Sequence, residues 1–499
     1  MLPGLLGYAL MMRMAETTGA RPRRSAFFRG WLAGVGYFAV GVWWITEAFL
    51  VDAAAHGWMA PFALLFMAGG LALFWGLAAL LYRIADVRGP GRVLVFTGAL
   101  ALLEWVRSHI FTGFPWNLPG ESWTAGGAVS QVASLIGPYA LSWVTIALAA
   151  SFALALDAGS PRRRFAGPLL AALVLAGMFA FGTVRLSTAP PVRADAPMVR
   201  IVQADIDQKD KWKPENLDAI VEAYVELSRG KPGDPVPQII VWPEGALPAV
   251  IDDLLAPGSP YVARFAQAVA PGQTLLLGAN RVQFDAQGQP DYFNSLVALR
   301  GEPEGLKVTG VYDKHRLVPF GEFLPFGDLA TRLGIRSLVH MPEDFTAGPA
   351  PRPISPQGLP PLQPLICYEA LFPRFAEAAA TRAGLRPQWL LNVSNDAWFG
   401  ATSGPWQHLN IASYRAIESG LPIIRATPTG VSAVIDAQGR IVPGAELGLG
   451  KTGVIDARLP APRARTIYSV ISEAGFAMML LLSLAMVGFR QLHRRIERN

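Results

Sequence analysis

The chain has 499 residues, of which 52% are hydrophobic and only 16% are charged, and its mean hydropathy is +0.32. This apolar balance argues against an ordinary soluble protein and favours a membrane protein. The formal net charge is +6, but no zinc-ligand spacing or basic–aromatic motif is present, so we expect no nucleic-acid partner, no metal and no cofactor. Apolar residues concentrate before residue 187 and after residue 473, with a globular composition between them.

Five apolar segments in the N-terminal part approach or exceed the roughly 20 residues that cross a bilayer. They are 31–51, 58–83, 92–111, 126–156 and 165–186. A shorter one follows at 474–490, so the sequence predicts six spans. Residues 2–12 are apolar but too short to span, and we interpret them as an interfacial stub, the truncated end of a longer helix, or a frayed terminus.

The loops between these segments alternate in charge. Loops rich in arginine precede Trp31 and surround Val87 and Pro161, whereas 52–57 and 114–126 contain no Lys or Arg. Arginine-rich loops are cytoplasmic by the positive-inside rule. The region between the fifth and sixth spans then lies outside the cytoplasm, and the basic tail QLHRRIERN agrees with this orientation.

The same pattern predicts the domain organisation. Residues 1–186 form a transmembrane helix bundle, and the proline-containing stretch 187–197 is a linker. Residues 198–465 form a catalytic domain outside the cytoplasm, and 466–499 form a last transmembrane helix with a basic cytoplasmic tail.

The region after the linker has an α/β pattern. Short apolar runs typical of buried strands alternate with helix-like stretches. The strand-like runs are MVRIVQA, QIIVWPE, TLLLGA, SLVAL, LQPLICYE, WLLNVSN, LPIIRAT and SAVIDAQG. The helix-like stretches are 216–229, 260–269, 372–383 and 408–419.

Three polar residues stand at strand ends in this region: Glu244, Lys314 and Cys367, the only cysteine of the chain. Ligands of sheet-based α/β folds gather beyond the carboxyl ends of strands, so these side chains can meet in one pocket. A thiol nucleophile needs a base, and a carbonyl under attack needs a cation for its oxyanion. Glutamate, lysine and cysteine supply this set for acyl transfer.

Each residue also has a simpler interpretation. A lone cysteine is more often buried in a core, Glu244 could cap a helix, and Lys314 could be a solvated loop charge. A histidine-based cysteine triad is a further alternative, for which His315, His340 and His408 are the available histidines.

Sequence blocks around these residues decide between the interpretations. VWPEGALP, YDKHRLVPFGEFLP, PLICYEALFP and YRAIESGLPIIRATPTGVSAVIDAQGR resemble, in order and spacing, the blocks of the nitrilase (carbon–nitrogen hydrolase) superfamily. The resemblance covers essentially all of 198–457. It implies a nitrilase-like domain built as a four-layer α-β-β-α sandwich.

The membrane segments narrow the resemblance. A nitrilase-like domain between N-terminal spans and one C-terminal span is similar to the apolipoprotein N-acyltransferase family, as are GWLAGVGYFAVGVWWI, LEWVRSHIFTGFPWN and VQADIDQKDKW. The family usually has eight membrane helices, so a first helix is missing here and the second is truncated. We therefore doubt that Met1 is the natural start.

The family resemblance implies a role for each site residue. Glu244 is the general base, Lys314 the oxyanion stabiliser and Cys367 the nucleophile. The supporting residues are Glu322, Tyr368, Glu369 and Trp212.

The resemblance further implies a reaction with two lipid substrates. Cys367 takes an acyl chain from a phospholipid, usually phosphatidylethanolamine, and passes it as a thioester to the α-amine of a diacylglyceryl-cysteine at a lipoprotein N-terminus. We expect a monomer in the bacterial inner membrane with its catalytic domain on the periplasmic side. Phe323 and Trp398, in two aromatic segments, are candidates for the substrate access route.

Two rival functions remain open. A membrane-tethered nitrilase or amidase acting on a small soluble C–N substrate would use the same three residues, although six spans are then unexplained. A transporter with an external binding domain would need intramembrane charge pairs and broken-helix repeats, which the sequence does not show.

Overall fold

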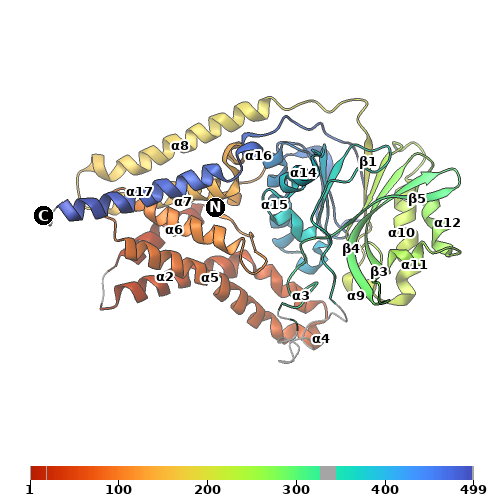
Figure 1. The fold of residues 1–499 in the computed structure, drawn as a ribbon, viewed down its shortest axis with the longest axis horizontal. Helices are drawn as coiled ribbons and strands as arrows, with labels where there is room; N and C mark the ends of the chain where they lie inside the picture. Colours follow the sequence, from red (N-terminus) through yellow and green to blue (C-terminus); the bar gives the residue numbers. More distant parts are fainter. Residues whose placement is uncertain (1, 18–19, 326, 328–343, 497–499) are drawn as a thin grey trace. The chain divides into compact units, whose positions relative to one another are not determined.

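The computed structural model describes residues 2–17, 20–325, 327 and 344–496 (Figure 1). The chain divides into two compact units. The first combines Met1–Ala189 with Arg465–Asn499, and the second is Pro190–Ala464. The division points lie inside the predicted linker and just before the last helical segment, and we describe each unit by itself.

The first unit is helical. Its helices are α1 (Leu2–Glu16), α2 (Pro22–Gly41), α3 (Glu47–Leu50), α4 (Ala53–His56), α5 (Ala60–Ala85), α6 (Arg92–Arg107), α7 (Ala133–Ser151), α8 (Pro161–Ser187), α16 (Ile467–Ile471) and α17 (Ala474–Ile496). Short 3₁₀ turns, among them η1 (Trp43–Thr46) and η4 (Val129–Val132), lie between them.

The number of membrane crossings stays a prediction. Within the described residues, three helical stretches are long and apolar enough to cross: Ala53–Ala85, Val129–Leu156 and Pro161–Ser187. A fourth would be Pro22–Gly41 with Trp43–Leu50 if this pair, bent by 62°, is one span. The other two predicted spans coincide with α6, which has 16 residues, and with the shorter apolar part of α17.

Small residues allow close packing in this unit. A Cβ atom on Gly30 of α2 would lie 2.5 Å from the Cβ of Ala79 in α5, and one on Gly34 would lie 2.9 Å from the Cβ of Ala72. The two glycines are four residues apart and therefore lie on one face of α2. Helices in lipid associate through such small-residue faces, since apolar burial does not drive them together.

The N-terminal stub is a packed helix. Tyr8 and Met12 of α1 are buried in the core of the helical unit together with Trp75 and Ala149. A frayed terminus is therefore the wrong interpretation, because an unpacked segment would not bury these side chains.

The second unit contains two sheets. Its strands are β1 (Met198–Gln203), β2 (Ile239–Trp242), β3 (Thr274–Phe284), β4 (Pro290–Glu302), β5 (Gly305–Asp313), β6 (Leu362–Ile366), β7 (Trp389–Val393), β8 (Ile423–Ala426), β9 (Ser432–Ile435), β10 (Ile441–Leu447) and β11 (Gly453–Arg458). Their order is β11-β1-β2-β3-β4-β5 in one sheet and β10-β9-β8-β7-β6 in the other. Its helices are α9 (Gln208–Lys211), α10 (Leu217–Arg229), α11 (Ile251–Leu254), α12 (Pro260–Ala268), α14 (Phe375–Ala383) and α15 (Gly404–Ser419).

The sheets pack face to face because their strands are apolar on both sides. In β2, Ile239 and Val241 join a core shared with residues of the other sheet, such as Ile366 and Leu391. The alternating residue Ile240 instead joins a core with α10 and α12. Helices α14 and α15 lie beside the outer face of the second sheet (Figure 1). The four-layer α-β-β-α sandwich is therefore confirmed.

Candidate active site

The ends of three strands bring the predicted site residues together. Lys314 directly follows β5, Cys367 directly follows β6, and Glu244 lies two residues beyond β2. β2 and β3 are parallel, and β4 is antiparallel to both β3 and β5, so β2 and β5 end at the same edge of their sheet. The topology therefore gathers these side chains at one place.

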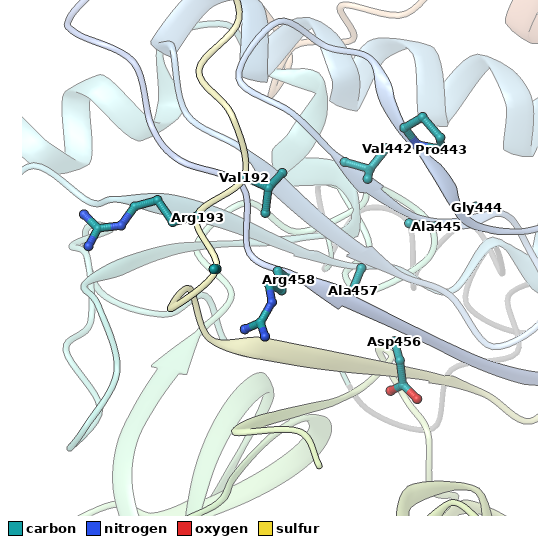
Figure 2. A pocket seen from close by; sticks show the side chains of 10 residues that line it. Val192, Arg193, Val442, Pro443, Gly444, Ala445, Asp456, Ala457 and Arg458 are labelled. Carbon is teal, nitrogen blue, oxygen red and sulfur yellow. The ribbon is translucent and has the colours of Figure 1, made fainter. Parts of the chain in front are cut away.

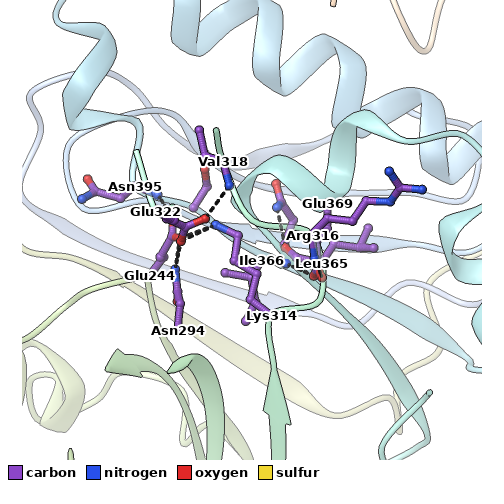
Figure 3. Close-up of polar contacts among 12 residues, drawn as sticks. Glu244, Asn294, Lys314, Arg316, Val318, Glu322, Leu365, Ile366, Glu369 and Asn395 are labelled. Atoms are coloured by element: carbon purple, nitrogen blue, oxygen red, sulfur yellow. Dashed lines mark hydrogen bonds and ion pairs between the residues drawn. The ribbon is translucent and has the colours of Figure 1, made fainter. Parts of the chain in front are cut away.

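Lys314 is held between two carboxylates (Figure 3). Its Nζ lies 3.2 Å from Oε1 of Glu244 and 2.9 Å from Oε1 of Glu322. The lysine is 1% exposed and both glutamates are buried. Burial alone would lower the pKa of Lys314, but the two carboxylates raise it above its ordinary value, so the side chain is an ammonium ion. An ammonium has three N–H donors, and these carboxylates take two of them, which leaves one for a substrate oxygen.

The carboxylates are oriented by further donors. Asn294 of β4 donates from Nδ2 to Oε1 of Glu244 and to Oε1 of Glu322, at 2.7 Å each. The other oxygen of Glu244 accepts the backbone N–H of Asn395 at 2.6 Å, and that of Glu322 accepts the N–H of Val318 at 2.8 Å. Both carboxylates are therefore fixed in position before any substrate binds. Asn294 is absent from the sequence prediction, because its role depends on partners that are distant in the chain.

Cys367 occupies a tight turn from strand to helix. Its φ is +47°, a left-handed conformation that non-glycine residues rarely adopt, and it begins the 3₁₀ helix η8 (Cys367–Leu371). Such strain clusters at functional sites and requires a surrounding structure that holds it. The holding group is the Glu369 carboxylate, whose Oε2 accepts the N–H of Ile366 at 2.9 Å.

Glu369 also ties this turn to the loop that carries Lys314. Its Oε1 accepts the backbone N–H groups of His315 and Arg316 and the hydroxyl of Tyr312. The carboxyl is fully buried, and burial raises its pKa to about 7 although these hydrogen bonds act in the opposite direction. Glu369 therefore acts by positioning the lysine loop relative to the cysteine turn (Figure 3).

The surroundings of the half-buried Cys367 raise the pKa of its thiol. Burial raises its pKa well above the ordinary value, and the Glu244 carboxylate raises it further. The Lys314 ammonium and the neighbouring Ser394 hydroxyl lower it. A half-buried thiol with a raised pKa needs a base during attack, and the negative charge of Glu244 acts on it directly.

A second polar network lies beside the cysteine and was missed by the sequence prediction. Ser394 donates to Oδ1 of Asp396 at 2.7 Å, and the same oxygen lies 3.0 Å from Nδ1 of His408. The other oxygen of Asp396 pairs with the guanidinium of Arg425. Burial alone would raise the pKa of Asp396, but Arg425 and His408 lower it, so the carboxylate is ionised. The signal was available in the polar residues directly after the strand WLLNV.

The histidine alternative is not supported by the geometry. His315 Nδ1 lies 2.9 Å from the carbonyl oxygen of Gly348. His408 interacts with Asp396 and with the backbone of Cys367, and burial lowers its pKa. His340 lies outside the described residues.

The remaining predicted residues surround this centre less closely. Tyr368 is buried and its ring lies 5.1 Å from that of Phe372 in an edge-on arrangement. Trp212 and Trp398 are 51% and 39% exposed, and Phe323 is half-buried. The part of the Phe323 segment formed by residue 326 and residues 328–343 lies outside the described residues.

A separate shallow cleft lies between residues 192–194 and the strands β10 and β11 (Figure 2). None of the predicted site residues lines it. Two of its charged groups are in ion pairs, since Asp456 binds Arg200 and Arg193 binds Asp195, and Arg458 donates to the carbonyl oxygen of Ala196. In the described part of the chain, no group of three His, Cys, Asp or Glu side chains is arranged to hold a metal ion.

Comparisons with known proteins match both parts of the chain. The family model described as apolipoprotein N-acyltransferase N-terminal domain matches residues 2–151, and the carbon-nitrogen hydrolase model matches residues 198–468. The chain also resembles a solved amidase from Nesterenkonia sp. AN1, with 22% identity and a TM-score of 0.36, over 56% of this chain and 98% of the amidase. A likeness this slight carries no weight.

Similar full-length relatives are named apolipoprotein N-acyltransferase. The protein from Caulobacter vibrioides is 53% identical over 97% of this chain and 89% of its own length. Those from Rhodopseudomonas palustris and Rhizobium leguminosarum bv. trifolii are 40% and 38% identical, over 97% and 96% of this chain and 90% and 91% of their own lengths. With both domains matched and relatives this similar along nearly the whole chain, the protein belongs to the apolipoprotein N-acyltransferase family.

Proposed function

We propose that this protein is an N-acyltransferase that moves a fatty acyl chain from a membrane phospholipid to the N-terminal amine of a diacylglyceryl-lipoprotein, through a thioester on Cys367. The observation that carries the proposal is the Glu244–Lys314–Glu322 cluster at the strand ends next to the strained Cys367 turn. Family membership supplies the substrate classes, and the apolar helices supply the membrane setting.

The first half-reaction forms the thioester. Glu244 accepts the proton of the Cys367 thiol as the sulfur attacks the ester carbonyl of the donor, and the free N–H of Lys314 stabilises the oxyanion. The C–O bond of the ester then breaks. The glycerol oxygen leaves with the proton from Glu244, and a lysophospholipid is released.

The second half-reaction uses the same groups. The uncharged α-amine of the lipoprotein attacks the thioester carbonyl, and Glu244 removes its surplus proton. The C–S bond breaks, the proton returns to the sulfur, and an amide is released. A thioester suits this relay because thiolate is both a good nucleophile and a good leaving group.

The topology expected from the arginine-rich loops completes the proposal. In this proposal the catalytic domain lies on the periplasmic side of the bacterial inner membrane, phosphatidylethanolamine is the donor, and the enzyme is a monomer. The exposed indoles of Trp212 and Trp398 suit a position near the bilayer surface, where aromatic side chains are enriched.

The mass of the intact protein after incubation with phosphatidylethanolamine alone tests the reaction. We expect the added mass of one acyl chain on the wild-type protein, its location on Cys367 by peptide mapping, and its loss in Cys367→Ala. Transfer of that chain to a diacylglyceryl peptide would complete the cycle. A wild-type protein that gains no acyl chain but releases ammonia from a small amide would instead be a tethered amidase.

A further inference from the structure

Two buried polar side chains next to the active site make no side-chain hydrogen bond to any described residue. Lys211 is 2% exposed and Gln208 is 7% exposed, yet neither the lysine Nζ nor either amide atom of Gln208 has a hydrogen-bond partner among the described residues. Nor does any described carboxylate lie within salt-bridge distance of Lys211. Native proteins rarely leave buried polar groups unsatisfied, so each such group requires an explanation.

The two side chains are placed by the same short helix. Gln208 and Lys211 begin and end α9, three residues apart, and residues at this spacing lie on the same face of a helix. α9 follows β1, which runs parallel to β2, so it stands at the sheet edge where β2 and β5 also end.

The ammonium of Lys211 lies beside the catalytic carboxylate. A Cβ atom built on Gly245 would lie 3.2 Å from Lys211 Nζ, and Gly245 directly follows Glu244. The negative charge of Glu244 also acts on the Lys211 ammonium. The exposed indole of Trp212 lies next to the same ammonium, with Nζ 5.4 Å from the ring centre.

We propose that Lys211 and Gln208 form the subsite for the phosphodiester of the acyl donor. The proposal rests on the proposed function. An ammonium and an amide N–H together offer donors to an oxyanion, and lysine binds phosphate as a point charge. The phosphodiester is the anionic group of the donor closest to its ester carbonyls, so a site beside Glu244 holds it while Cys367 attacks.

The positive charge of the subsite should affect only one of the two half-reactions. The acceptor presents an amine and carries no phosphate at its reacting end, so an ammonium at this place offers it no attraction. Lys211 should therefore act on formation of the thioester from a phospholipid and not on transfer of the acyl chain to the amine. A group that acted only through Glu244 would change both steps equally.

The test compares two acyl donors on the full-length protein. One is phosphatidylethanolamine and the other is a p-nitrophenyl ester of the same fatty acid, which has no phosphate. We expect Lys211→Met to slow thioester formation from phosphatidylethanolamine about 10- to 100-fold, the range for a lost hydrogen bond to a charged group, and to leave the reaction of the p-nitrophenyl ester unchanged. Gln208→Glu should act in the same direction by repelling the phosphate, and Lys211→Arg should restore part of the rate.

Lys213→Met is the matched control. Lys213 is two residues further along, about half exposed, and paired with Asp210, so its loss should leave both reactions unchanged. Lys211→Met should also raise the thermal midpoint of unfolding, because it removes a buried charge that has no described carboxylate within salt-bridge distance. A purely structural lysine would lower it.

Four results would overturn the subsite. Equal slowing with both donors would assign Lys211 to the electrostatics of Glu244, and no slowing with either would leave it without a role in the reaction. Inhibition of both donors by inorganic phosphate in the wild type, but not in Lys211→Met, would show a site for free phosphate. If the wild type reacts with the p-nitrophenyl ester but never with phospholipid, the proposed function fails and the subsite falls with it.

Discussion

The carboxylate of Glu369 accepts the backbone N–H of His315 at 2.8 Å, and so joins the loop after β5 to the turn after β6. The lysine and the cysteine of the site are carried by these two segments. Their relative position is therefore set by a buried hydrogen-bonded carboxyl that touches neither reacting group.

Glu369→Ala should reduce thioester formation about 100-fold, because misplacement by about 1 Å of a reacting group costs this much. The measurement is single-turnover acylation of Cys367 followed by mass spectrometry. Glu446→Ala, at an exposed position of β10, is the control. Full activity of Glu369→Ala would mean that the two segments hold their positions without it.

Glu369 should also make stability depend on pH. Its pKa is about 7 in the folded protein, above the ordinary value of 4.5, so the folded state retains a proton that the unfolded chain has released. Its contribution to stability is complete below pH 4.5 and is lost as the pH rises through 7. The thermal midpoint should fall over this window in the wild type and fall less in Glu369→Gln. Identical pH profiles would contradict the assignment.

Asn294→Leu removes the N–H groups that hold Glu244 and Glu322 in place. We expect a loss of about 10- to 100-fold in kcat/KM for the phospholipid, since each lost hydrogen bond to a charged group is worth about 1.5–3 kcal/mol. Asn294→Asp should be worse, because it adds a third carboxylate to the cluster. Gln283→Leu, on the exposed part of β3, is the control.

Gly278→Ala should displace the catalytic carboxylate. A Cβ atom at this position would lie 2.6 Å from the Cα of Glu244, whereas one on Gly310 of β5 would make only ordinary contacts at 3.7 Å or more. We expect loss of acylation and about 1–3 kcal/mol of destabilisation for Gly278→Ala, and little change for Gly310→Ala. Equal activity of the two variants would show that the backbone near Glu244 yields without consequence.

Asp396→Asn should destabilise the catalytic domain by about 3–5 kcal/mol, because it leaves the buried guanidinium of Arg425 without its anion. Asp195→Asn breaks an exposed pair with Arg193, which water and salt screen, and should leave stability nearly unchanged. Thermal unfolding in detergent compares the two. Since Ser394 also contacts the cysteine, the rate of thiol alkylation should change in Asp396→Asn alone.

Local signals predict the strands that are buried on both faces. The runs IIVW and LQPLI are buried throughout, and both form strands where expected. β10 and β11 have one buried position each among half-buried and exposed ones, and no long apolar run marks them. Helix α15 begins at Gly404, four residues before the predicted start, because Pro405 is tolerated in the first turn of a helix.

The site could be predicted only in part for a similar reason. Glu244, Lys314 and Cys367 stand at the ends of strand-like runs, and the resemblance of the sequence blocks around them singled them out. Asn294 lies inside a strand, and its partners are 50 and 28 residues away. Lys211 lacks a hydrogen-bond partner among the described residues because of the packing around the four-residue helix α9. A helix this short has no hydrophobic periodicity from which its burial could be predicted.

The proposed catalytic groups are divided between the two sheets. Glu244 and Lys314 extend from the six-stranded sheet, whereas Cys367 extends from the five-stranded sheet. Neither sheet holds a complete set, so the reaction depends on the apolar contact between them, to which Leu276 and Ile366 contribute. Loosening of that contact should abolish turnover before either sheet unfolds, and enzyme activity is then a sensitive measure of how tightly the two halves of the sandwich are joined.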